Sequence, residues 1–167
     1  DTWRYKVFKI FANPPIERDG RLMIYYGGKL GTVPIETGNQ PFQALCLATL
    51  RTDGFVSLTA GDKAGQVITK PFVASSRRLM LNVNAHENGG AGKKARGEAR
   101  VEVLDESGDP IRGFDLNSSV PLRGHDVEQA VSWKNKAKWA LLTGRKVALR
   151  IHLRQADLFA FWIENSP

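Results

Sequence analysis

The fold is decided by the stretch Val147-Ala148-Leu149-Arg150-Ile151-His152-Leu153-Arg154, in which every second residue is aliphatic. A period of two places these aliphatic side chains on one face of an extended strand and the small or charged ones on the other. Residues 98–103 and 79–86 alternate in the same way. Turn-forming glycine, proline, Asn and Asp separate such segments, and helical periodicity is nearly absent. We therefore predict an all-β fold, a two-sheet antiparallel sandwich of jelly-roll or concanavalin-like type.

Three further segments fit this prediction. Residues 158–163 are apolar on both sides, which is typical of a central strand covered on both faces. The run Asp105–Pro110 combines residues that favour tight reversals and predicts a turn between 101–104 and 111–114. Residues 136–142 predict a short helical connector, because their apolar residues are followed by a glycine.

Composition limits the class of protein. The chain has 167 residues, 42% of them hydrophobic and 25% charged, which excludes a wholly disordered or collagen-like polypeptide. A chain of this length buries enough surface to fold without disulfides or a structural metal. The single Cys46 excludes an internal disulfide framework and a multi-cysteine zinc site. The longest charge-free stretch, residues 37–50, is too short and polar for a membrane helix, so we expect no membrane partner.

The first forty residues differ from the rest in their sequence pattern. A predicted strand at residues 22–26 is followed by a loop, 29–41, that is rich in glycine, proline and threonine. We interpret residues 1–40 as strands and a linker left from a preceding unit, and residues 41–167 as the sandwich domain.

The net charge of +7 favours anionic partners such as nucleic acid or acidic polysaccharide. Nucleic acid is not favoured, because neither interleaved aromatic residues nor a recognition helix accompanies the basic residues. Part of the positive charge lies in a predicted flexible loop from Glu87 to Gly97. Its glycines and lysines lack the spacing of a phosphate-binding loop, and the role of this loop is not defined by the sequence.

No catalytic residue, metal ligand or cofactor site is assigned. His86, His125 and His152 lack the close spacing of metal ligands, and no Ser or Cys is marked as a nucleophile beside a base. The acids of residues 105–110 do not form a twelve-residue calcium loop. Glycoside hydrolysis stays open as an alternative, since it requires only two suitably placed carboxylates. The acids available for it are Asp53, Glu102, Asp115 and Asp126.

Several polar and aromatic residues are candidates for binding a sugar. Arg51 and Asp53 are two positions apart, so they either pin the start of a strand or bind hydroxyls from one face. Amide, carboxylate and guanidinium groups on the polar strand faces suit hydroxyls and would converge if their strands were neighbours. These groups belong to Asn82, Asn84, Arg100, Glu102, Arg150 and His152. The candidate ligand-binding residues are Arg51, Asp53, Asn82, Asn84, Glu102, Asp126, Trp133 and Arg150. Trp133 and Trp139 are candidates for an aromatic platform beneath a sugar ring. The alternative is a solvated polar face, with both tryptophans in the core.

A series of segments resembles one protein family in order and spacing. They begin with Leu22-Met23-Ile24-Tyr25-Tyr26-Gly27-Gly28 and continue with 48–58, 65–71, 81–85, 100–105, 113–114, 124–126, 131–133 and 156–161. Together, from Pro14 to Trp162, they resemble the C-terminal part of secreted bacterial glycosidase-like or sucrase-like proteins, which are frequent in planctomycetes. In these proteins a five-bladed propeller precedes a jelly-roll or lectin-like sandwich.

The resemblance implies a function as well as a fold. Residues 22–28 would correspond to the last propeller strand, and the catalytic carboxylates of such enzymes lie in the propeller. We expect a non-catalytic, carbohydrate-associated module of a secreted or periplasmic glycoside-hydrolase-like protein. Its expected partners are an upstream propeller in cis and a polysaccharide. A purely structural domain that stabilises the propeller, a hydrolytic domain and a binder of anionic polymers are the alternatives. The long basic loop from Glu87 to Gly97 departs from the family pattern.

Overall fold

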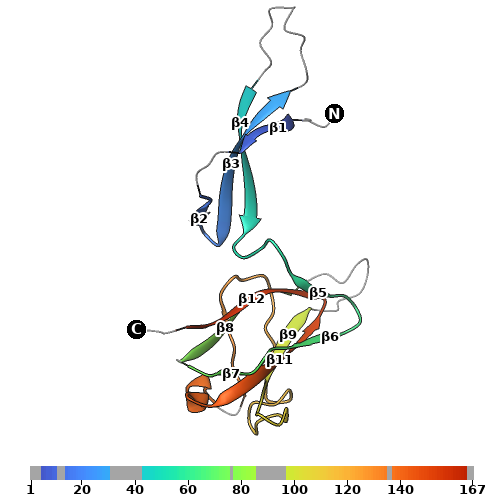
Figure 1. Cartoon of the computed structure of the whole chain (residues 1–167). Helices are drawn as coiled ribbons and strands as arrows, with labels where there is room; N and C mark the ends of the chain where they lie inside the picture. The colour runs from blue at the N-terminus through green and yellow to red at the C-terminus, as the bar shows by residue number, and fades with distance from the viewer. Residues whose placement is uncertain are drawn as a thin grey trace, which may run out of the picture. The chain divides into compact units, whose positions relative to one another are not determined.

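A computed structural model describes residues 5–10, 14–30, 43–75, 77–85, 97–134 and 137–164. The chain divides into two compact units, Asp1–Phe55 and Val56–Pro167, and Figure 1 shows the strands of each. Each unit is described by itself below.

In its described residues, the first unit is a four-stranded antiparallel sheet. Its strands are β1 (Tyr5–Ile10), β2 (Ile16–Arg18), β3 (Arg21–Leu30) and β4 (Gln43–Arg51). β4 pairs with β3 along nearly its whole length, so β1 and β2 pair with the two ends of β3 on its other edge. Asp19 and Gly20 join β2 to β3 with φ angles of 51° and 69°. Positive φ at both positions is the geometry of the type I′ turn, which Asp-Gly favours between paired strands.

The boundary between the units differs from the prediction. Residues 43–51 were predicted to open the sandwich, but they form β4 and pair with β3 of the first unit. The second unit therefore begins at Val56 rather than at residue 41. The strand predicted at residues 22–26 is confirmed within β3.

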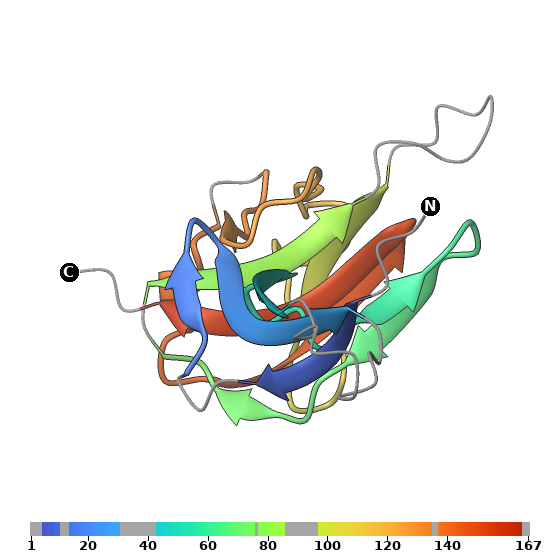
Figure 2. The ribbon, with the colours of Figure 1, turned by 90° about the horizontal axis from the view of Figure 1, so that it is seen from above.

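The described residues of the second unit form two antiparallel sheets. In the first sheet the order is β10 (Gln129–Ala130), β8 (Arg78–Ala85), β12 (Ala156–Glu164) and β5 (Leu58–Ala60). In the second, β11 (Lys146–Arg154) pairs with β6 (Gly65–Ile68), β7 (Phe72–Val73) and β9 (Glu98–Leu104). Figures 1 and 2 both show β8 beside β12, in agreement with their paired register.

The aliphatic faces of the two sheets form one core. Leu81, Val101 and Leu149 come from β8, β9 and β11, and each is fully buried. The predicted alternation is thus confirmed for β9 and β11, and with it the all-β sandwich. In β8 the predicted aliphatic face lies in the core, but Met80 and Asn82 on its other face are buried as well. β12 lies between β8 and β5, as predicted for a central strand, although Phe161 is 39% exposed. The jelly-roll order of the strands stays a prediction.

The connections follow local turn chemistry. The Asp105 carboxylate accepts hydrogen bonds from the Ser107 and Asp109 amides at 2.9 and 3.1 Å, and this confirms the predicted reversal. Residues 111–114 after it do not form a strand, so the reversal is not a hairpin between two strands. The predicted helical connector is confirmed as a short 3-10 helix, η2 (Trp139–Leu142). It ends before Gly144, whose φ of 83° favours glycine.

A segment after this reversal runs along the edge of β9 that faces away from β11. Ala99 exchanges two backbone hydrogen bonds with Leu122, at 2.8 and 3.0 Å. The Val101 amide donates to the Ser119 hydroxyl, and the Trp133 indole donates to the Val101 carbonyl. The backbone groups of β9 on this edge are therefore bonded although no strand lies there among the described residues.

The core packing makes a stability prediction. We expect Leu149→Ala to lower the free energy of unfolding by about 2–5 kcal/mol, because it leaves a cavity between the sheets. Leu141→Ala is the matched control, since Leu141 is 71% exposed and its loss should cost less than about 0.5 kcal/mol. Urea denaturation followed by tryptophan fluorescence measures both values. Equal midpoints for the two variants would contradict the assignment of Leu149 to the core.

Candidate functional site

A cluster of charged side chains lies on the outer face of the second sheet. The register of β9 and β11 places Glu102 opposite Arg150 and Arg100 opposite His152. Paired residues of antiparallel strands share a face, and the neighbouring Val101 is buried in the core on the opposite face. The strand alternation therefore brings these four polar side chains together.

Glu102 is the centre of this cluster. One carboxylate oxygen, Oε2, lies 2.8 Å from His152 Nε2 and accepts a hydrogen bond of 3.2 Å from Arg150 Nη1. The other oxygen, Oε1, accepts the Leu116 amide at 3.1 Å. Glu102 is only 6% exposed, so the carboxylate is held by protein groups on both oxygens.

These contacts determine the charge of Glu102. Burial by itself raises the pKa of the carboxyl group, but hydrogen bonds from His152, the Leu116 amide and Arg150 outweigh it. The pKa is therefore lowered from its ordinary value of 4.5, and Glu102 is ionised at neutral pH.

Glu98 is the second carboxylate of the same strand face. It accepts Arg123 Nη2 at 2.8 Å and Arg100 Nε at 3.3 Å, and Arg154 Nη2 lies 3.7 Å away. Burial again raises the pKa, and the two hydrogen-bonded arginines lower it by more. Glu98 is thus an ionised anchor with three guanidinium groups around it.

A groove of about 320 Å³ lies beside these residues. Its lining consists of Ala64, Glu98, Arg100, Leu116, Asn117, His152, Leu153 and Arg154. One wall is shaped by Asp115, whose carboxylate accepts the Ser118 amide and hydroxyl at 3.0 and 3.1 Å. The pKa of Asp115 is lowered, first by the Ser118 amide bond. This turn holds Leu116 and Asn117 against the strand face.

The two carboxylates of this cluster do not match the acid pair of a glycosidase. Glu98 and Glu102 are four residues apart on one strand, so their Cα atoms are roughly 13 Å apart at about 3.3 Å per residue. In a glycosidase the general acid requires a raised pKa. Both carboxylates here have lowered pKa values. The cluster instead offers fixed donors and acceptors for a polar ligand.

Two of the predicted ligand-binding residues, Glu102 and Arg150, meet in this cluster. Asn82 and Asn84 do not join them, because β8 belongs to the other sheet. Asn82 is 1% exposed, and Asn84 donates to Asp157 at 3.3 Å. The predicted convergence of all the polar strand faces is therefore wrong for the two asparagines.

Three further predicted residues lie elsewhere. Arg51 ends β4 of the first unit, and Asp53 follows in a turn with φ of 57°, so the two do not share a strand face as predicted. Asp126 is exposed and accepts the Glu128 amide at 3.2 Å, outside the groove lining. Arg51 and Asp53 do not pin the start of the next strand either, because 52–55 form the turn and that strand begins at Leu58.

The two tryptophans considered as a sugar platform are core residues. Trp133 is 4% exposed and packs edge-on against Phe114, with 4.9 Å between the ring centroids. Its indole N–H donates to the Val101 carbonyl. Trp139 is 2% exposed and donates to the Ser75 carbonyl at 3.0 Å. Burial of both rings leaves neither as an exposed platform. The predicted basic loop from Glu87 to Gly97 lies outside the described residues except for Gly97.

The sequence reasoning missed four residues of the site. Glu98 and Arg154 continue the polar alternation of β9 and β11 by one step, and that signal identifies them. Arg123 and Asn117 come from the irregular segment beside β9, where no periodicity marks them.

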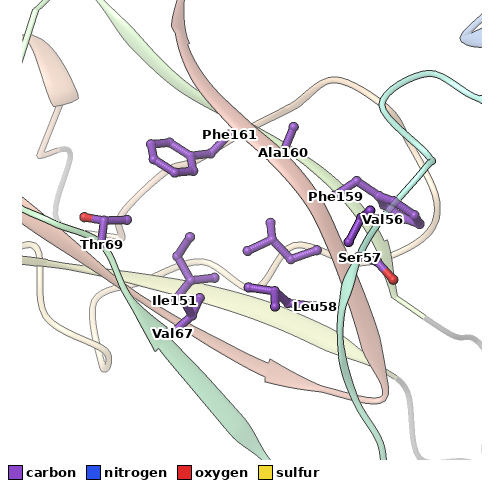
Figure 3. Close-up of a pocket in the computed structure, with 10 residues that line it drawn as sticks. Val56, Ser57, Leu58, Val67, Thr69, Ile151, Phe159, Ala160 and Phe161 are labelled. Atoms are coloured by element: carbon purple, nitrogen blue, oxygen red, sulfur yellow. The ribbon is translucent and has the colours of Figure 1, made fainter.

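A second hollow, of about 250 Å³, opens between the two sheets. Figure 3 shows Phe161 of β12 across this pocket from Val67 of β6 and Ile151 of β11. Its two hydroxyl side chains already have partners: Thr69 accepts the Leu149 amide, and Ser57 lies 3.2 Å from the Thr59 hydroxyl. The pocket is therefore an apolar gap without converging polar groups, unlike the charged groove.

Comparison with known proteins found no match to a protein-family model, a curated protein or a solved structure. Among the described residues, no helix is long and apolar enough to cross a membrane. The same residues contain no group of three or more His, Cys, Asp or Glu side chains arranged to hold a metal ion.

The ionised state of Glu102 makes a pH prediction. Because its folded-state pKa lies below 4.5, the carboxylate stabilises the fold above this pH, and the contribution is lost as the pH falls through the lowered value. Glu102→Gln removes the charge and should cost about 1–3 kcal/mol at neutral pH. We expect the difference between the native protein and this variant to shrink below pH 4.5.

Urea denaturation over a series of pH values measures this difference. Glu106→Gln is the control, because Glu106 has a 69% exposed side chain and only a 3.9 Å ion pair with Lys146. It should change the neutral-pH stability by less than about 0.5 kcal/mol. A Glu102→Gln penalty that stays constant into acid would contradict the role of its charge.

Proposed function

We propose that the second unit is a non-catalytic, carbohydrate-binding accessory module and that the charged groove is its ligand site. The observation that carries this proposal is the convergence of carboxylate, guanidinium, imidazole and amide groups around one groove. Planar groups of these types bind sugar hydroxyls, because each hydroxyl both donates and accepts. The groups are already held by one another, so little conformational entropy is lost when a ligand binds.

The groups have complementary roles in this proposal. Asn117 is exposed on the groove wall and offers both donors and an acceptor. Arg100 and Arg154 supply donors, and Glu98 supplies acceptor oxygens beside them. Leu116 adds apolar surface on which the carbon-bound hydrogens of a sugar ring can pack.

The first unit supports an upstream partner in cis. All buried hydrophobic side chains among the described residues lie in the second unit, from Ala60 onward. The sheet of the first unit carries Tyr25 and Leu47 on one face, 39% and 47% exposed, and Leu22 and Tyr26 on the other. Sheets with apolar residues on both faces are normally covered on both. We propose that a preceding propeller-like domain provides this cover, in a secreted or periplasmic glycoside-hydrolase-like protein.

A purely structural role is the second candidate. It is favoured by the internal pairing of Glu98 and Glu102, which satisfies both carboxylates without a ligand. A hydrolytic role is less well supported, because a general acid requires a raised pKa and the pKa values of Glu98 and Glu102 are both lowered.

Matched amide deletions distinguish binding from a structural role. Asn117→Ala removes an exposed groove amide, and we expect it to weaken glycan binding about tenfold, a loss of roughly 1.4 kcal/mol. Asn84→Ala removes an amide from the other sheet and should leave binding within twofold, or about 0.4 kcal/mol. A glycan array identifies the ligand, and calorimetry measures the affinities. Binding that is lost with Asn84→Ala and kept with Asn117→Ala would place the site elsewhere, and absence of glycan binding would favour the structural role.

A further inference from the structure

We infer that the saccharide bound in the groove is acidic and carries carboxylate or sulfate groups. This inference rests on the proposed function of the groove and specifies its ligand. It is carried by the balance of charges around the groove and by the way in which the arginines are held.

The described residues of the cluster contain more positive than negative charge. Four guanidinium groups, of Arg100, Arg123, Arg150 and Arg154, lie within 4.0 Å of the two carboxylates. The ionised Asp115 of the groove wall is a third carboxylate. Because one carboxylate neutralises one guanidinium group, one positive charge remains uncompensated. Lys134 adds a further ammonium group, which donates to the Asn117 carbonyl at 3.1 Å on the groove wall. The local field therefore favours a negative ligand.

Arg154 is the arginine best placed to use this excess charge. Its Nη2 lies 3.7 Å from Glu98 Oε1, which is too long for a hydrogen bond. The side chain is 50% exposed and lines the groove. The ion pair with Glu98 thus positions the guanidinium group of Arg154 without accepting a hydrogen bond from it. A planar guanidinium with such donors matches carboxylate and sulfate oxygens, often with two parallel bonds.

Glu98 holds the neighbouring guanidinium groups in place. It contacts Arg100, Arg123 and Arg154 from one carboxylate whose side chain is 16% exposed. Arg100 is fixed by a second contact, 3.5 Å from its Nη1 to the Ser119 carbonyl. Like-charged side chains would otherwise spread apart, so the shared carboxylate keeps them beside the groove. This arrangement reduces the ordering cost when an anionic group binds.

The excess charge also disfavours a neutral sugar. A neutral saccharide would replace water around Arg100 and Arg154 without compensating their charge, whereas an anionic group restores the lost interaction. A volume of about 320 Å³ is at the small end of ligand pockets, so the groove fits a short segment of a chain.

Matched probes test the charge of the ligand. Calorimetry on the full chain compares oligogalacturonate with its fully methyl-esterified form, and dextran sulfate with dextran. The members of each pair share a backbone and differ in charge. We expect binding to one or both acidic members, at least about tenfold tighter than to the neutral ones, and weaker at high salt. The acidic probe that binds more tightly identifies carboxylate or sulfate as the preferred group.

A pair of arginine variants tests the site. Arg154→Gln removes a groove charge, and Arg78→Gln removes an equivalent one from β8, where Arg78 is 60% exposed and 3.9 Å from Glu164. Arg154→Gln should weaken acidic binding about tenfold, because a charge-assisted bond is lost, and Arg78→Gln by less than about twofold. Equal losses in the two variants would indicate general charge attraction and overturn the site.

The remaining outcomes separate this inference from the proposed function. Equal binding of acidic and neutral probes, weakened by Asn117→Ala, would overturn the acidic ligand and leave carbohydrate binding supported. Absence of binding to all saccharides on the glycan array as well would overturn both. Equally tight binding of a DNA duplex, weakened by the same Arg154→Gln variant, would overturn the saccharide assignment in favour of nucleic acid.

Discussion

The register between β9 and β11 is the constraint on which the second unit depends. Opposing residues on these strands share a face, so one register sets both the aliphatic core and the charged outer face. A shift by one residue would turn Glu102 and Arg150 into the core and expose Val101 and Ile151. The hydrophobic effect and the cost of burying charge thus both disfavour the shifted register. The charged cluster is a by-product of this register as well as a candidate site.

The sequence predicted those parts of the fold that depend on local periodicity. The alternation in residues 147–154 was sufficient for a sandwich, because a strand with one aliphatic face requires a second layer. It did not predict the boundary at Val56, since residues 43–51 are apolar on both sides and do not indicate which sheet they join. The dipeptide Asp19-Gly20 is a hairpin signal, but the short β2 before it has no alternation that predicts a strand.

The candidate site was likewise predicted only where it depends on local periodicity. Glu102 and Arg150 were identified from the polar faces of two strands that prove to be neighbours. Asn82 has the same signal, but its strand pairs in the other sheet, and periodicity alone does not determine which strands pair. Trp133 was ambiguous because an aromatic ring is equally common in a core and on a binding surface. Arg123 lies in an irregular segment, so only the folded structure reveals its contact with Glu98.

The segment beside β9 also has a consequence for intermolecular strand pairing. An uncovered strand edge is a template on which another chain can add its own strand, and this is a common route to aggregation. On β9 the backbone N–H and C=O groups of Ala99, Val101 and Val103 on this edge are already hydrogen-bonded. Their partners are Leu122, Ser119, Trp133, Phe114 and Ile111. Side chains and single bridges thus block that edge against intermolecular strand addition. The charged face can in this way remain solvent-accessible beside a sheet edge that does not recruit further chains.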